Sequence, residues 1–108
     1  MRVLVVEDQA TLREAILESL AILGVGLEGC ATGAEARAAF SREPADLVLT
    51  DLRLEAPEMG LELVRAFRGE RPTTEVLLMT AYGTVEVAVA AMKAGAFDFL
   101  VKPFTLDH

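Results

Sequence analysis

Short apolar runs alternate with longer amphipathic segments along this chain. The first run, Val3-Leu4-Val5-Val6, is continuous, which is typical of a strand buried on both faces of a parallel sheet. The pattern predicts strands at residues 2–7, 26–31, 46–50, 75–79 and 97–101. Apolar residues at helical spacing predict helices at residues 10–23, 34–42, 60–69 and 84–94.

Turn and cap residues support these segments. Gly24 and Gly95 follow the first and fourth predicted helices, where glycine commonly ends a helix. Thr32 precedes the second helix with Glu35 three residues later, as in a capping box. Strict alternation of strands and helices predicts the α/β class, with a doubly wound, five-stranded parallel sheet and helices on both faces.

Polar residues follow four of the predicted strands. Glu7 and Asp8 stand at the end of the first strand, and Asp51 follows the third, Thr80 the fourth and Lys102 the fifth. Ligands of parallel α/β sheets bind outside the carboxyl ends of the strands. We therefore expect these side chains to lie together at one edge of the sheet.

This set of side chains suits phosphoryl chemistry beside a metal ion. Three close carboxylates repel one another unless a cation neutralises them, and hard oxygen ligands suit Mg²⁺. A lysine and a threonine hydroxyl can bind phosphoryl oxygens, and an aspartate can form an aspartyl phosphate. Taken singly, Asp8 is as well explained as a helix cap, Thr80 as a turn residue and Lys102 as a surface amine. Their joint placement favours a site.

Composition narrows the class of protein. The 108 residues suit one domain, and 53% are apolar with 25% charged, as in a globular protein. One cysteine and one histidine exclude a zinc cluster or an internal disulfide. The net charge of −7 disfavours direct binding of nucleic acid. No apolar run is long enough to span a membrane and the first residues are not a signal peptide, so we expect a cytoplasmic protein.

Four motifs now identify a resemblance. The segments VLVVED, DLVLTDLRL, LLMTAYG and AGAFDFLVKPF resemble the response-regulator receiver domain of two-component signalling, over residues 2–105. The resemblance implies a flavodoxin-like sheet with strand order 2-1-3-4-5. The amino-acid sequence of the last two motifs is most similar to that of receivers of transcriptional activators, including the enhancer-binding type.

The resemblance also implies a role for each matching residue. Asp51 would be the phosphorylated residue, with Asp8 a direct Mg²⁺ ligand and Glu7 holding metal-bound waters. Arg53 would give its backbone carbonyl to the metal, and Thr80 would bond a phosphoryl oxygen.

Further expectations concern the last predicted strand. Lys102 would pair with Asp51 and then with the phosphoryl group, and the Lys102-Pro103 bond would be cis. Phe99 matches the switch aromatic, with ordinary packing as the alternative.

The implied activity is a switch rather than an enzyme. A sensor histidine kinase would donate the phosphoryl group, and the switched domain would control an output domain or partner protein in transcription regulation. Only autophosphorylation and autodephosphorylation chemistry is expected.

Two departures from the family pattern stand out. Glu55 occupies the position where the family usually has proline, and Gly60 comes one residue late, so the loop after Asp51 holds one extra residue. The final helix is absent after Thr105, which makes residues 1–108 a single receiver domain truncated at the start of that helix. Exposed apolar strand surface then predicts marginal stability, a homodimer or an exchanged assembly.

Three other classes of protein compete with the receiver assignment. A pseudo-receiver would bind a partner without being phosphorylated, but the full set of site residues argues against it. A Mg²⁺-dependent phosphatase would need a second acid two residues after the nucleophile, where this chain has Arg53. A flavin-binding module would need a phosphate loop rich in Gly, Ser and Thr after the first strand, where Glu7 and Asp8 stand.

Overall fold

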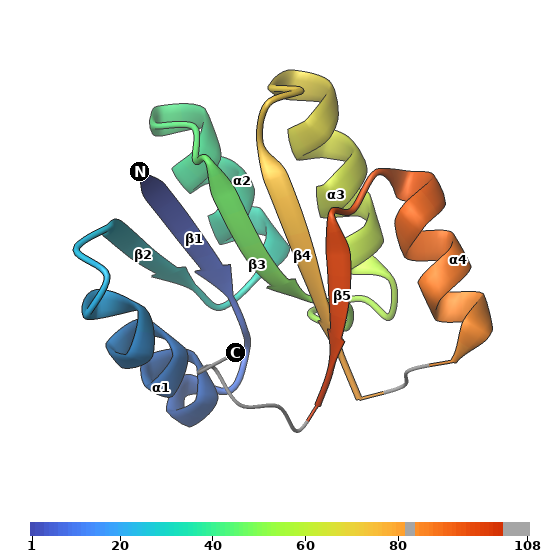
Figure 1. The fold of residues 1–108 in the computed structure, drawn as a ribbon, viewed down its shortest axis with the longest axis horizontal. Helices are drawn as coiled ribbons and strands as arrows, with labels where there is room; N and C mark the ends of the chain where they lie inside the picture. The colour runs from blue at the N-terminus through green and yellow to red at the C-terminus, as the bar shows by residue number, and fades with distance from the viewer. Residues whose placement is uncertain (82–83, 103–108) are drawn as a thin grey trace.

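The protein is described here from a computed structural model covering residues 1–81 and 84–102. Its centre is a five-stranded sheet in the order β2-β1-β3-β4-β5, with every pair parallel (Figure 1). The strands are β1 (Arg2–Val6), β2 (Gly26–Cys30), β3 (Leu47–Asp51), β4 (Glu75–Thr80) and β5 (Asp98–Val101). The helices are α1 (Ala10–Ala21), α2 (Gly33–Arg42), α3 (Met59–Glu70) and α4 (Val85–Ala94). The predicted class and strand order are confirmed.

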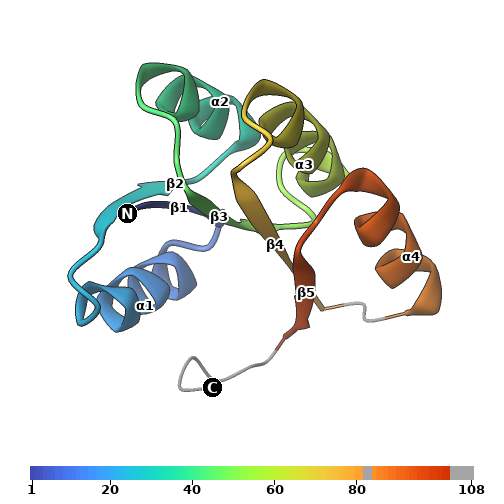
Figure 2. The same ribbon diagram turned by 45° about the horizontal axis from the view of Figure 1, so that its top comes forward.

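Helices cover both faces of the sheet, as predicted. Figure 2 shows α1 below the sheet and α2, α3 and α4 above it. Side chains alternate along β1, so that Leu4 and Val6 belong to the core cluster on the side of α2, α3 and α4, while Val3 and Val5 belong to the cluster on the side of α1. This explains why the run in β1 is apolar at every position: it has no solvent-facing side.

The upper layer holds the aromatic centre of the core. The rings of Phe40 in α2 and Phe67 in α3 stack with centroids 4.3 Å apart, and both side chains are buried. Leu61 and Val64 lie on the same face of α3 and are also buried, as the helical spacing predicts. This contact joins α2 to α3 directly above the central strands.

The end of α1 differs from the prediction. The helix ends at Ala21, and the chain turns through Ile22 and Leu23 to Gly24, whose φ is 71°. The predicted helix over residues 10–23 is therefore two residues too long, and Leu23, whose apolar side chain favoured its inclusion, is 69% exposed. The Leu23 and Gly24 amides donate to carbonyls three residues back, which tightens the last turn and rotates Leu23 away from the sheet.

The caps of α2 and α4 follow the sequence signals. The Thr32 hydroxyl oxygen accepts the Glu35 amide at 3.1 Å, as predicted for the first half of a capping box. Thr84 does the same for the Val87 amide at 3.2 Å, and Gly95 ends α4 with a φ of 105°.

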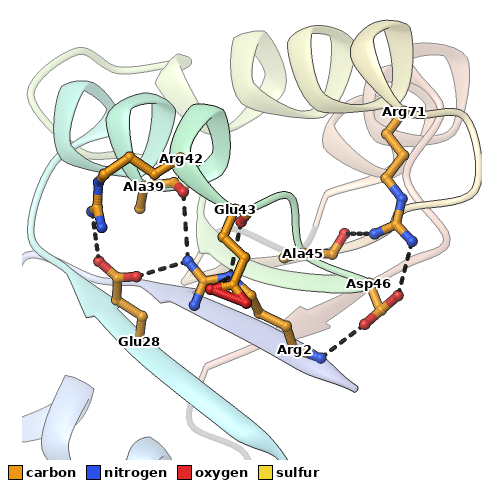
Figure 3. A network of polar contacts seen from close by, with 8 residues as sticks. All are labelled: Arg2, Glu28, Ala39, Arg42, Glu43, Ala45, Asp46 and Arg71. Atoms are coloured by element: carbon orange, nitrogen blue, oxygen red, sulfur yellow. Dashed lines mark hydrogen bonds and ion pairs between the residues drawn. The ribbon is translucent and has the colours of Figure 1, made fainter.

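A network of ion pairs joins the amino ends of the strands (Figure 3). The Arg2 guanidinium lies 2.7 Å from Glu28, which also pairs with Arg42 at 3.1 Å. The Asp46 carboxylate accepts the Arg2 amide at 2.8 Å and the Arg71 guanidinium at 3.1 Å. The network ties β1 to β2, to the start of β3 and to the end of α3.

These contacts predict a pH dependence of stability. The Arg2 side chain holds the pKa of Glu28 below its usual value, and the Arg2 backbone amide does the same for Asp46, helped by Arg71. A lowered folded pKa means that the stabilisation is present above the unfolded values of about 4.3 and 3.9 and is lost as pH falls through the folded values. We expect the double variant Glu28→Gln/Asp46→Asn to lose less stability than wild type in urea unfolding between pH 5 and pH 3.

The matched control for that prediction lies on α1. Glu14→Gln/Glu18→Gln removes two exposed carboxylates that make no hydrogen bond or ion pair in the described part of the chain. This control should keep the wild-type acid slope. Equal slopes for all three proteins would show that the network contributes nothing.

Two expectations fall outside the described residues: the cis Lys102-Pro103 bond and the first turn of a final helix after Thr105. Among the residues that are described, none of the helices has the length and apolar character needed to cross a membrane.

Candidate functional site

The predicted site residues meet at the carboxyl edge of the sheet. β3 runs through Asp51, one residue beyond its predicted end, because Asp51 pairs with Met79 of β4. β4 likewise runs through Thr80, whose carbonyl accepts the Lys102 amide at 2.7 Å. The extra pairing fixes the backbone at both residues, so their side chains leave the sheet in defined directions.

Three acids form one cluster. Glu7, Asp8 and Asp51 each offer a carboxylate oxygen, and these oxygens lie within 4.8 Å of one another. Glu7 is 0% exposed and Asp51 9% exposed, whereas Asp8 is open to solvent. Asp8 does not cap α1, because the residue at the cap position is Gln9. A hard cation that keeps several waters fits this set of oxygens, with room for the waters on the Asp8 side.

Lys102 faces two of the three acids. Its Nζ lies 2.7 Å from Glu7 Oε1 and 3.0 Å from Asp51 Oδ2. The resemblance implied the contact with Asp51, but no feature of the sequence indicated the contact with Glu7. Glu7 Oε2 accepts the Gln9 amide at 3.0 Å, so both oxygens of this buried carboxylate have partners.

The surroundings shift the pKa of both partners. Burial raises the pKa of Glu7 above its ordinary value, although the bonds from Lys102 and Gln9 oppose the shift. Burial also acts to lower the pKa of Lys102, but its bonds to Glu7 and Asp51 outweigh burial and leave the pKa raised. Lys102 is therefore a fixed positive charge beside Asp51 at neutral pH.

Thr80 and Phe99 lie on neighbouring strands. Thr80 is buried and is paired in register with Val101, while Phe99 is paired with Leu78, two residues back along β4. Side chains two residues apart on a strand share a face, so Thr80 and Phe99 lie on the same face. Phe99 is half-buried and packs against the upper core, beneath α4. Phe97, predicted to lie in this strand, precedes β5 and is exposed.

Gly60 packs directly on the backbone of the acceptor. Its amide donates to the Leu52 carbonyl at 2.9 Å. A Cβ at this position would lie 2.4 Å from the Asp51 carbonyl oxygen and 2.7 Å from Leu52 Cα. Glycine is required here because the first turn of α3 touches the end of β3.

Sequence reasoning missed one contact of the loop after Asp51. The Glu55 carboxylate accepts the amides of Gly33 and Ala34 at 2.8 and 3.2 Å. The Gly33 bond is the main cause that holds the pKa of Glu55 below its ordinary value. No local pattern links residue 55 to residue 33; the only signal is an acid where the family usually has proline. The same loop carries Arg53, whose side chain is exposed.

Comparison with known proteins agrees with this fold. A receiver from Methanospirillum hungatei JF-1 described as CheY-like superposes with a TM-score of 0.88 and 29% identity, covering 96% of this chain and 82% of that one. NtrX from Brucella abortus superposes with a TM-score of 0.88 and 30% identity, covering 98% of this chain and 24% of that one.

The sequence comparisons give the family. Residues 3–108 match the model of the response regulator receiver domain. The response regulator protein PilR of Pseudomonas aeruginosa is 41% identical over 99% of this chain, and the regulatory protein AtoC of Escherichia coli K12 is 38% identical over 99%. The chain belongs to the response regulator receiver family, as the four motifs predicted. It spans about a quarter of the length of these relatives, 24% and 23%.

Proposed function

We propose that this domain accepts a phosphoryl group on Asp51 from a histidine kinase, in a Mg²⁺-dependent reaction, and switches conformation as a result. The observation that carries the proposal is the position of the Asp51 carboxylate. This carboxylate belongs to the acid cluster with Glu7 and Asp8, and the Lys102 ammonium lies 3.0 Å from it.

The chain's own residues perform defined tasks. An Asp51 oxygen forms a bond to phosphorus as the bond from phosphorus to the kinase histidine breaks, and the imidazole keeps that electron pair. Lys102 provides a positive charge beside the entering phosphoryl oxygens. Glu7, Asp8, Asp51 and the Arg53 carbonyl would hold Mg²⁺, which when bound offsets the charge of the phosphoryl group. Water reverses the modification by hydrolysing the acyl phosphate.

The switch follows from the placement of Thr80 and Phe99. We infer that the Thr80 hydroxyl bonds a phosphoryl oxygen and that Phe99, on the same face, repacks beneath α4. The phosphoryl group shifts the population between two packings by as much as its contacts differ in each. Phe99 has no hydroxyl, so its part in the switch is packing alone.

The partners follow from the family. The relatives are about four times longer than this chain and bear names of response regulators and regulatory proteins. We propose that the switched domain controls an output domain or partner protein in transcription regulation, as the resemblance to receivers of transcriptional activators implies. The net charge of −7 disfavours direct binding of nucleic acid, so we propose that any nucleic-acid contact is made by that partner and that the reaction takes place in the cytoplasm.

Intact mass after incubation with acetyl phosphate tests the proposal. Wild type should gain one phosphoryl mass with Mg²⁺ and none without it, and Asp51→Asn should gain none under either condition. Asp98→Asn, the same substitution on exposed Asp98 of β5, should behave as wild type. If wild type gains no mass with Mg²⁺, the result would favour a pseudo-receiver that acts by binding alone, or a site disabled by the altered loop after Asp51.

A further inference from the structure

The loop between β3 and α3 is fixed to α2 at its middle. Glu55 Oε1 accepts the Gly33 amide at 2.8 Å and Oε2 accepts the Ala34 amide at 3.2 Å, across 22 and 21 residues of sequence. The first amides of a helix have no partners within the helix, so an acceptor from elsewhere can take them. Thr32 takes the next amide, that of Glu35. The loop and the cap residue therefore share the first turn of α2.

A second contact strengthens the same junction. A Cβ on Gly33 would lie 2.7 Å from Met59 Cγ and 2.8 Å from Met59 Sδ, so the Met59 side chain covers this glycine. Met59 begins α3, directly after the loop. Glu55 and Met59 thus hold the middle and the end of residues 52–59 against one point of α2.

The two ends of the loop are held close together, because the Gly60 amide donates to the carbonyl of buried Leu52 at 2.9 Å, and Leu54 packs against the core. The middle of the loop has few backbone bonds of its own. Among the described residues, its amides form two contacts inside the loop, from Leu54 and from Met59 to the Ala56 carbonyl, each 3.2 Å long. It holds one residue more than the family pattern and has Glu55 where a proline would restrict the backbone. Without an outside anchor, such a loop samples many backbone positions.

We infer that Glu55 is a positioning residue of the phosphoacceptor site, which sets the backbone at Arg53 by fastening the loop to α2. The inference rests on the proposed function, in which the Arg53 carbonyl serves the Mg²⁺ site. Glu55 acts on that site only through the loop. Groups that orient metal ligands without touching the metal commonly contribute tenfold or more to affinity.

Titration of the protein with Mg²⁺ alone, followed by the NMR signals of the site amides, tests the inference. Glu55→Ala should raise the dissociation constant for Mg²⁺ by about tenfold, at the low end for supporting residues. Glu55→Gln keeps an oxygen that can accept the Gly33 amide, so it should recover most of the affinity. The rate of phosphoryl uptake from acetyl phosphate should fall and recover in the same order.

Two matched controls separate positioning from other effects. Glu58→Ala removes an equal charge from the same loop, where the Glu58 carboxylate makes no hydrogen bond or ion pair in the described part of the chain; affinity should stay within about twofold of wild type, since exposed charges interact weakly. Thr32→Ala removes the other cap of α2 and should lower thermal stability while leaving Mg²⁺ affinity unchanged.

Three outcomes would count against the inference. Equal dissociation constants for Glu55→Ala and Glu58→Ala would show that any loss of Mg²⁺ affinity comes from the lost negative charge and not from the contact with α2. If Thr32→Ala weakens Mg²⁺ binding as much as Glu55→Ala does, the loss of affinity comes from the lower stability of α2. If wild type binds Mg²⁺ and takes up the phosphoryl group while Glu55→Ala matches it, only the role of Glu55 is overturned; if wild type does neither, the proposed function falls as well.

Discussion

Replacing Lys102 with methionine is expected to tighten Mg²⁺ binding while slowing phosphorylation of Asp51 by roughly a hundredfold, the usual loss when one group that stabilises transition-state charge is removed. The two changes have opposite signs because Lys102 faces the same carboxylates that would hold the metal. Its Nζ donates hydrogen bonds to Glu7 Oε1 at 2.7 Å and to Asp51 Oδ2 at 3.0 Å, so it competes with a metal ion for these oxygens.

The expected gain in metal affinity is about tenfold, or ~1.4 kcal/mol. Two unit charges 4 Å apart interact by about 4 kcal/mol near a protein surface, and solvent around the exposed Asp8 side screens part of this. The loss in rate has a separate cause, because methionine matches the length of the lysine stem but offers no charge to the phosphoryl oxygens.

Lys93→Met is the matched control. Lys93 lies on the exposed surface of α4, so its substitution changes net charge equally without touching the acids. Magnesium titration and the time course of mass gain should both stay at wild-type values. A parallel fall of affinity and rate in Lys102→Met would show that the lysine supports the structure of the site rather than the transfer step.

Gly60→Ala is expected to lower the free energy of unfolding by about 3 kcal/mol, at the upper end for overpacking. The added methyl group would lie 2.4 Å from the Asp51 carbonyl oxygen, and the backbone on both sides of this contact is held by hydrogen bonds, from the Gly60 amide to the Leu52 carbonyl and from the Thr50 hydroxyl to the Asp51 carbonyl. Either α3 moves away from β3 or the end of β3 moves, and both displace the acceptor. Urea unfolding at pH 7 measures the loss.

Gly69→Ala provides the opposite case in the same helix. A Cβ at Gly69 meets nothing within 4 Å, so alanine should stabilise α3 by about 0.5–1 kcal/mol through helix propensity. A similar effect for both substitutions would contradict the close approach at Gly60. Phosphoryl uptake should fall in Gly60→Ala alone.

The sequence predicted the fold because each signal for it is local. A strand such as β1, buried on both faces, must be apolar at every position, and the acids that follow strands must arrive at one edge when all strands are parallel. Glu7, Asp51, Thr80 and Lys102 could be assembled in this way before any coordinates were known. Their contacts confirm that they meet, while their chemical roles remain predictions.

The details that escaped prediction depend on how distant segments pack. Nothing near Glu7 in sequence indicates that Lys102 will reach it, and nothing near Glu55 points to Gly33, because each pairing depends on the path of the whole chain. The predicted end of the first helix at Leu23 was wrong for a different reason. Helical periodicity continues through Leu23, but the turn that leads to Gly24 ends the helix first. Apolar spacing indicates which face a helix buries and does not indicate where the helix stops.

The site joins the two extremes of the folded chain. Lys102 follows β5 and its bond to Glu7 spans 95 residues, and within the described part of the chain β5 is an edge strand whose one partner is β4. Contacts so distant in sequence form late in folding, and edge elements open more readily than central ones. When β5 detaches, β1 and β3 keep their acids but lose the cation beside them. We therefore expect the proposed phosphoryl-accepting site to be completed late in folding and to be lost before the rest of the domain unfolds.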